Sequence, residues 1–245
     1  TRSTAFGTGA PALGTGALER SDERGAALRQ NWESLNMIPL SSYITDTYHI
    51  WSTFPIRTLD DLRNRKLAAP GTSANWLTGT GATPVDGALT TYYTDIQTGV
   101  IEGALSFFVG ILPTRVYEVA RHVTKCDIGA MYVGGIAVNR QRFGRYPEAV
   151  RNALVAAGRI STQKHIEDAP ARGAASAART GQKGAIISTL PPAERERWIR
   201  GLPNIARTWV DSSGPASRDV LNAYFAAIRA AGQTPGRNWD REVTA

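Results

Sequence analysis

The feature that most constrains the fold is an alanine-rich stretch from Glu148 to about Gly181, which is typical of one long helix. Only Pro170, Gly158 and Gly173 interrupt it. Helices in globular proteins average about 11–12 residues, so a helix of this length is unusual in an α/β chain. It is either an ordinary surface helix or a spine that spans and couples two lobes.

Short strands and short helices alternate along the residues that precede this helix. The spacing predicts βα units and a mainly parallel sheet. We expect strands at 37–40, 43–54, 66–69 and 100–103 and in the stretch 126–139, a short helix that starts at 58–61, and helices at 73–78 and 89–98. Two more helices, at 192–201 and 217–232, follow the long one.

The strand at 43–54 alternates aromatic and polar residues with a period of two. This pattern predicts an extended strand that exposes Tyr48 and Ile50 on one face and His49 and Trp51 on the other.

Composition excludes several classes of protein. The 245 residues are 42% hydrophobic and 20% charged, which fits one large domain or two modest lobes. The net charge of +7 comes mainly from arginines that are mixed with acids, as in residues 194–197, so we expect no nucleic-acid partner. The longest apolar run, Leu105–Leu112, is too short to span a membrane. The single cysteine, Cys126, is expected to be a packed thiol.

Signatures of catalysis and cofactor binding are missing from the sequence. His49, His122 and His165 are widely separated and form no metal-binding pattern. There is no G-x-S-x-G elbow, and the glycine-rich residues 1–20 lack the ending of a phosphate loop. Asp60-Asp61 is typical of the first turn of a helix. We therefore expect no enzyme, no metal and no cofactor.

Three stretches of the sequence carry recognisable motifs. Residues 55–67 (PIRTLDDLRNRKL) are similar to the pattern P-I-x-x-x-x-D-L-x-G-x-K-I. Residues 81–85 (GATPV) come next, and residues 93–103 (YTDIQTGVIEG) are similar to Y-x-A-L-Q-x-G-V-V-D-G. In this order and spacing, the motifs resemble those of the solute-binding proteins of tripartite ATP-independent periplasmic (TRAP) transporters, the DctP-like family. The resemblance extends from residue 50 to about residue 232.

The resemblance implies a two-lobed α/β binding protein with crossing connections and a long spine helix. Lobe I would hold residues 1–44 and 132–170, and lobe II residues 45–131 and 171–245. A small organic ligand would be trapped by hinge closure and delivered to the permease subunits in the membrane, without catalysis. The resemblance also implies export to the periplasm, with a signal peptide in the precursor, and we expect a monomer. The family's opening β-α-β region has no counterpart here, so we expect the sequence to be incomplete at its start.

The ligand-binding residues of the family are only partly retained. The arginine that usually holds a substrate carboxylate corresponds to Ala68, the common asparagine to Ser106, and a second arginine to the region of Thr47 and Tyr48. The residues at matching positions are aromatic or neutral and suit an uncharged or aromatic ligand. The expected ligand-binding residues are Tyr48, His49, Trp51, Asn75, Trp76, Leu89, Ser106, Phe107, Phe108 and Tyr132.

Each of these residues also has a purely structural explanation. Trp51 and Phe108 are as well explained by burial in a core, and His49 by a structural role. Two other functions stay open at this point. One is an α/β enzyme acting on a small aromatic substrate with His49 as acid or base, and the other is a ligand-sensing domain.

Overall fold

The computed structural model describes residues 32–127, 132–214, 217–230 and 232–242. These residues divide into two compact units. We call the described residues of 46–131 and 172–245 the sheet unit, and those of 32–45 and 132–171 the ribbon unit. The long helix α6 (Glu148–Gln182) gives its residues up to 171 to the ribbon unit and the rest to the sheet unit. The expectations for residues 1–31 lie outside the described residues.

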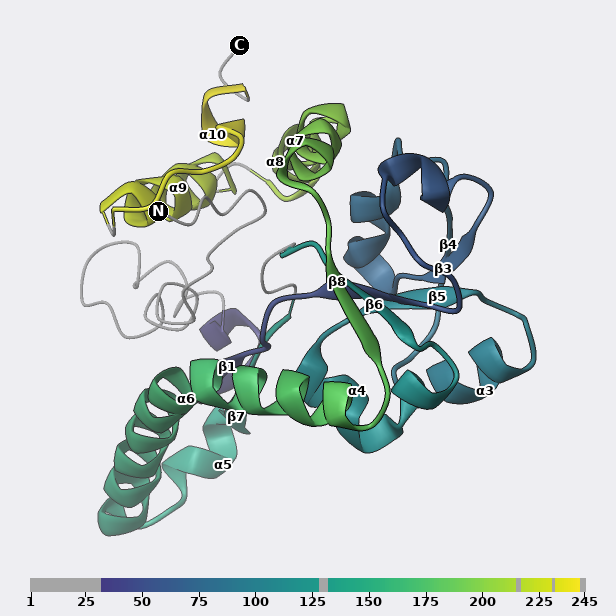
Figure 1. Ribbon diagram of the computed structural model, residues 1–245. Coiled ribbons are helices and arrows are strands. Elements are labelled where there is room, and N and C mark those ends of the chain that lie inside the picture. Colours follow the sequence, from purple (N-terminus) through teal and green to yellow (C-terminus); the bar gives the residue numbers. More distant parts are fainter. Residues whose placement is uncertain (1–31, 128–131, 215–216, 231, 243–245) are drawn as a thin grey trace. The chain divides into compact units, whose positions relative to one another are not determined.

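The sheet unit is built on a six-stranded sheet (Figure 1). Its strands, in spatial order, are β4 (Thr83–Val85), β3 (Lys66–Ala68), β5 (Gly103–Ser106), β2 (His49–Ser52), β6 (His122–Lys125) and β8 (Ile186–Thr189). Strand β2 is antiparallel to both of its neighbours, while the other pairs are parallel. The prediction of an α/β fold with a mainly parallel sheet is therefore confirmed.

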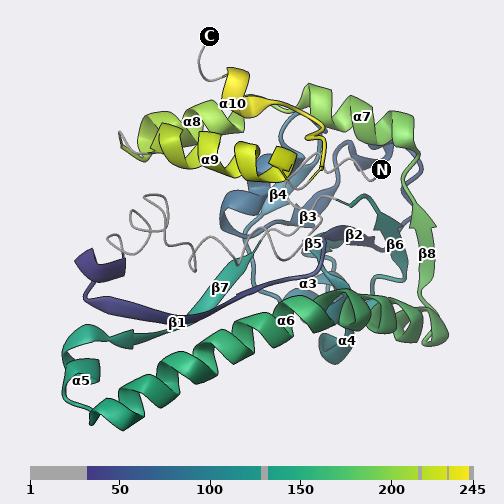
Figure 2. The ribbon, with the colours of Figure 1, turned by 90° about the vertical axis from the view of Figure 1, so that its left-hand side faces the viewer.

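Helices cover both faces of this sheet (Figure 2). One face packs against the 3₁₀ helices η2 (Leu59–Leu62) and η3 (Gly71–Leu77) and the α-helices α7 (Pro192–Gly201), α8 (Ile205–Ser212), α9 (Ser217–Ala230) and α10 (Trp239–Glu242). The other face packs against α3 (Tyr92–Gln97), α4 (Phe108–Thr114) and the 3₁₀ helix η4 (Val116–Glu118).

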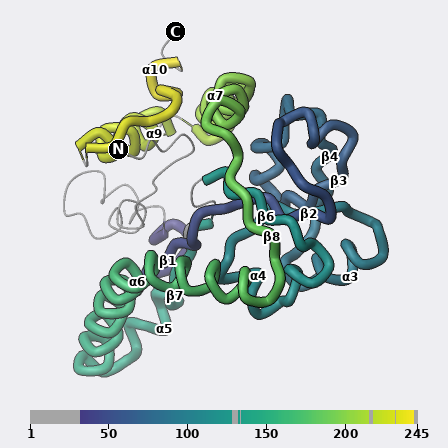
Figure 3. The backbone as a smooth tube through the Cα atoms, in the orientation of Figure 1, coloured from purple at the N-terminus to yellow at the C-terminus, as the bar shows by residue number. Residues whose placement is uncertain are grey.

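The prediction that β2 would expose its side chains is wrong. Tyr48 and Ile50 do lie on one face and His49 and Trp51 on the other, but all four are buried. Strand β2 lies inside the sheet, between β5 and β6, and both of its faces are covered by helices (Figure 3). A period of two reveals which side chains share a face, whereas the cover on that face comes from distant parts of the chain.

Several element boundaries differ from the sequence-based expectation. The strand predicted at 100–103 begins only at Gly103, because the backbone N–H groups of Val100 and Ile101 donate to the carbonyl of Asp95 (2.9 and 3.2 Å) and close the end of α3. Gly103 lies so close to β2 that a Cβ would overlap the carbonyl of Trp51. The expected strand 43–54 is two strands, since residues 45–48 belong to neither β1 nor β2.

The ribbon unit contains two antiparallel strands, β1 (Met37–Ile44) and β7 (Val133–Asn139), with α5 (Arg140–Gly144) and most of α6. Strand β1 is longer than the predicted 37–40, and Met37 at its start is 42% exposed.

Helix α6 packs on the backbone of β1. A Cβ at Gly158 would overlap the carbonyl of Leu40. The hydroxyl of Thr162 accepts a hydrogen bond from Ser42 N (3.0 Å), and His165 Nε2 lies 3.1 Å from Ile44 N. The long helix predicted from the alanine-rich sequence is thus confirmed, and it continues through Pro170. In the described ranges we find no helix, α6 included, with both the length and the apolarity to cross a bilayer.

Candidate functional site

The carboxyl edge of the six-stranded sheet is the candidate site of the sheet unit. Strands β3, β5 and β6 end at this edge, and the antiparallel β2 begins there, so that His49 pairs with Ser106. Ligands of open α/β sheets bind beyond the carboxyl ends of the strands. Six of the ten residues expected from the sequence lie at or next to this edge. They are Tyr48, His49, Trp51, Ser106, Phe107 and Phe108.

On one face of the sheet, three aromatic rings form a contact chain. The ring of Phe108 stands edge-on to His49, with 5.1 Å between centroids, and edge-on to Trp51 at 5.2 Å. His49 and Trp51 are 1% and 0% exposed, and Phe108 is also buried. These rings are part of the core of the sheet unit and support the edge from within.

On the other face, Tyr48 and Phe107 pack against each other with ring centroids 5.0 Å apart. Tyr48 is buried and Phe107 is half-buried. The ring of Phe107 also lies against α4. A Cβ at Gly110 of that helix would be 2.7 Å from Phe107 Cζ and 3.0 Å from Leu89 Cδ2. Leu89 is thereby placed next to the same turn.

Asn75 and Trp76 lie on η3, which follows the end of β3 at the same edge. Asn75 is exposed and Trp76 is half-buried. The indole of Trp198 donates to the carbonyl of Trp76 (2.7 Å), and the ring of Trp239 lies 6.1 Å from that of Trp76. Helices α7 and α10 therefore hold η3 in place. The side chain of Asn75 thus presents an exposed polar amide at this edge.

Tyr132 belongs to the ribbon unit and not to the sheet unit. It precedes β7, and its carbonyl accepts a hydrogen bond from Thr45 N (3.1 Å). Its side chain is 61% exposed.

Burial dominates the electrostatics of the edge. It lowers the pKa of His49 to about 4, with Asp127 opposing and Lys125 adding to the shift. His49 Nδ1 is buried without a hydrogen-bond partner among the described residues. A histidine in this environment is neutral at pH 7.

The residue that follows β6, Cys126, is a buried thiol. Burial raises the pKa of Cys126 well above its usual range, and its Sγ lies 3.8 Å from the carbonyl of Tyr48. Arg195 donates to the carbonyls of Cys126 and Asp127 (3.0 Å each), so its guanidinium is engaged by the protein backbone. The expectation of a packed thiol at Cys126 is confirmed.

Asp46 is a residue of this site that the sequence did not reveal. Its carboxylate accepts hydrogen bonds from Phe108 N (2.9 Å) and Val109 N (3.4 Å) at the start of α4. The two partners are more than sixty residues away in the chain, so no local pattern could have indicated the contact.

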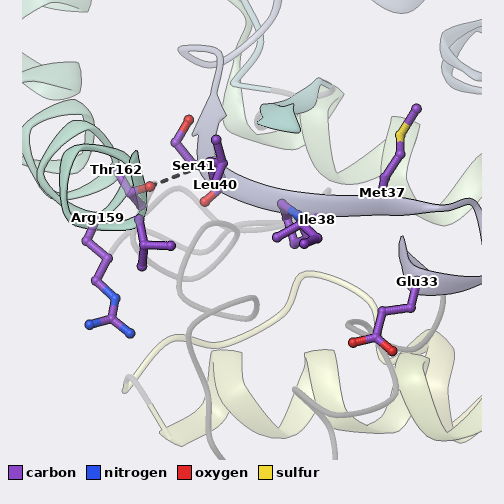
Figure 4. Close-up of a pocket in the computed structure, with 10 residues that line it drawn as sticks. Glu33, Met37, Ile38, Leu40, Ser41, Arg159 and Thr162 are labelled. Carbon is purple, nitrogen blue, oxygen red and sulfur yellow. Dashed lines mark hydrogen bonds between the residues drawn. The ribbon is translucent and has the colours of Figure 1, made fainter. Parts of the chain in front are cut away.

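The ribbon unit has a recess of about 450 Å³ between β1 and α6 (Figure 4). Met37, Leu40 and Ser41 line it from the strand, and Arg159 and Thr162 from the helix. None of the ligand-binding residues expected from the sequence lines this recess. Within the described ranges, no three His, Cys, Asp or Glu side chains gather as metal ligands would.

Comparison with known proteins gives the same family as the sequence motifs. Residues 16–211 match the model of the DctP family, bacterial extracellular solute-binding protein, family 7.

Solved structures share the fold. A TRAP periplasmic solute-binding protein from Chromohalobacter salexigens with bound d-glucuronate has a TM-score of 0.79, with 17% identity over 90% of this chain and 72% of that one. The periplasmic ectoine-binding protein of the Halomonas elongata TeaABC TRAP transporter has a TM-score of 0.78, with 17% identity over 88% and 70%. A Bordetella pertussis extracytoplasmic solute receptor binding pyroglutamic acid has a TM-score of 0.76, with 18% identity over 82% and 67%.

The family match covers most of the chain, and the fold shared with solved structures agrees with it. The chain therefore belongs to the DctP family and is a periplasmic solute-binding protein of the TRAP transporter class.

Proposed function

We propose that this protein captures a small organic ligand that is uncharged or aromatic, at the carboxyl edge of the sheet unit. The expected contacts are the side chains of the edge together with Tyr132 of the ribbon unit. They are Tyr48, His49, Trp51, Asn75, Trp76, Leu89, Ser106, Phe107, Phe108 and Tyr132.

The observation that carries this proposal is the chemistry of the edge. The position of the family's carboxylate-binding arginine is Ala68, which is 1% exposed and packs in the core with Tyr92. Arg195, the guanidinium next to the end of β6, already donates to two backbone carbonyls. Aromatic faces and neutral polar groups favour ligands with a large apolar surface and few charges.

The related proteins whose structures are solved bind d-glucuronate, pyroglutamic acid or ectoine. All three of these ligands carry a carboxylate group. We infer that this chain departs from them in the charge of its ligand while keeping their role in uptake.

We infer that the protein catalyses no reaction. The competing hypothesis was an enzyme with His49 as general acid or base. A general base must titrate near the working pH. Burial lowers the pKa of His49 to about 4, which disfavours that role.

We infer further that ligand binding is accompanied by a compaction of the molecule, as the family resemblance implies. Lobe I would comprise residues 1–44 and 132–170, and lobe II residues 45–131 and 171–245. The monomeric protein would then deliver the ligand to the permease subunits of its transporter. Small-angle scattering with and without ligand tests the compaction.

Thermal unfolding against a panel of compounds tests the choice of ligand. The panel contains succinate, d-glucuronate, pyroglutamate, ectoine, benzoate, benzenesulfonate and benzamide, each at about 1 mM. A compound bound with micromolar affinity adds about 4 kcal/mol to the free energy of unfolding, which raises the midpoint clearly. We expect the largest shift with neutral or aromatic compounds. A larger shift with succinate or d-glucuronate would contradict the proposal.

A further inference from the structure

The first turn of α4 organises much of the candidate site. Ser106 ends β5, Phe107 is the N-cap residue of α4, and Phe108 is its first helical residue. Phe108 contacts His49 and Trp51, and Phe107 contacts Tyr48. The position of this turn therefore decides where several of the expected ligand-binding side chains stand.

This turn cannot cap itself. The first N–H groups of a helix have no partner inside the helix and are usually satisfied by a Ser, Thr, Asp or Asn at the N-cap. The N-cap here is Phe107, whose side chain has no hydrogen-bond acceptor. The acceptor comes instead from Asp46, whose Oδ2 lies 2.9 Å from Phe108 N and 3.4 Å from Val109 N.

Asp46 stands at a special place in the chain. Residue 45 is the last one in the first segment of the ribbon unit, and Asp46, directly after it, belongs to the sheet unit. A Cβ added to Gly173 would lie 3.4 Å from the Cβ of Asp46. The positive charge of Arg172 favours the ionised form of the Asp46 carboxylate. Residues 172 and 173 are the first part of α6 that belongs to the sheet unit. One carboxylate therefore contacts α4 and lies beside a second connection between the units.

We propose that Asp46 is a positioning residue, which fixes the first turn of α4 at the point where the chain enters the sheet unit and thereby sets the placement of Phe107 and Phe108. The part of this inference that concerns ligand affinity rests on the proposed function.

The Asp46 carboxylate is only partly satisfied by hydrogen bonds. Its Oδ1 is buried without a hydrogen-bond partner in the described part of the chain, and burial raises the pKa of Asp46 against the opposing effects of the α4 N–H groups and Arg172. An asparagine keeps an acceptor for Phe108 N and carries no charge, so it can replace the cap. An alanine cannot.

The test compares D46A and D46N with the matched control D61A. Asp61 also accepts two backbone hydrogen bonds, from Arg57 N (2.8 Å) and Thr58 N (2.9 Å), but it lies on η2, between the end of β2 and the start of β3 and so away from the carboxyl edge. We expect amide hydrogen exchange at Phe108 and Val109 to be about fivefold faster in D46A, within twofold of wild type in D46N, and unchanged in D61A.

Affinity is measured by titration with benzamide or benzoate, whichever raises the wild-type midpoint more. D46A should weaken binding about fivefold, and D46N and D61A should leave it within twofold of wild type. Unchanged exchange in D46A would overturn the proposal. Faster exchange with unchanged affinity would also overturn it, because Asp46 would then be a structural cap only. If the wild type bound no compound of the panel, the proposed function would fail, and hydrogen exchange alone would decide whether Asp46 fixes α4.

Discussion

At the scale of single residues, the buried imidazole of His49 links the fold to solution conditions. Burial lowers its pKa to about 4 in the folded protein, against about 6.5 in an unfolded chain. Between these values the unfolded state binds more protons than the folded state does. The free energy of unfolding therefore falls as the pH drops from about 6.5 to about 4.

The variant H49N should remove this contribution. A difference of about 2.5 pH units corresponds to about 3 kcal/mol, so the wild type should lose up to about 3 kcal/mol more than H49N across this range. Urea unfolding at pH 4 to 7 measures the loss. The control is H122N, which removes a histidine that is only half-buried on β6. Parallel pH profiles of wild type and H49N would contradict the burial of a neutral imidazole.

The alternation in the sequence indicated the face of β2 on which His49 lies, but not the residues that bury the His49 side chain. Alternation is local and can be read from ten residues, whereas Phe108, which covers His49, is 59 positions away in the numbering. Asp46 was missed for the same reason.

At the scale of elements, the contact between α6 and β1 depends on a residue without a side chain. A Cβ at Gly158 would overlap the carbonyl of Leu40, so G158A must push the helix away from the strand. We expect a loss of about 1–3 kcal/mol in the free energy of unfolding.

The control for this prediction is G173A in the same helix. There the new Cβ would meet Asp46 at 3.4 Å, an ordinary contact, and alanine favours the helix by up to about 1 kcal/mol. Denaturant titration of both variants gives the comparison. Equal effects at the two glycines would show that helix α6 does not pack closely on β1.

Helix α7 contacts η3 through a part-buried hydrogen bond, from the Trp198 indole to the Trp76 carbonyl. W198F leaves that carbonyl without its donor and should cost about 1–3 kcal/mol of unfolding free energy. W209F, at a position that is 42% exposed, should change it by less than about 0.5 kcal/mol. Thermal or urea unfolding distinguishes the two. A loss at Trp209 as large as that at Trp198 would contradict this account of η3.

The elements predicted best are those with local signals. Helix α7 was predicted at its observed bounds, and the alanine-rich α6 to within one residue at its end. Thr58 and Asp61 gave the start of η2, where Asp61 accepts from Thr58 N. Strand β5 begins three residues later than predicted, because its start depends on a turn that closes α3 and on the close approach of β2.

At the scale of the whole molecule, the motif stretches in residues 55–103 identified the family, and the fold and the family match confirm it. The residues of the site are less well determined by the sequence. Motif positions indicated the aromatic residues near the carboxyl edge, but the same residues also build the core of the sheet unit. Only side chains with exposed area, such as Asn75 and half-buried Trp76 and Phe107, can contact a ligand without rearrangement.

The most direct test of the central claim is a calorimetric titration with benzamide and benzoate, which have the same shape and differ in charge. Without a carboxylate clamp at Ala68, the protein should bind benzamide at least about tenfold more tightly, a difference of about 1.4 kcal/mol. Tighter binding of benzoate would mean that a cation meets the ligand carboxylate, and the protein would then be an organic-acid receptor like the d-glucuronate and pyroglutamic acid proteins that share its fold.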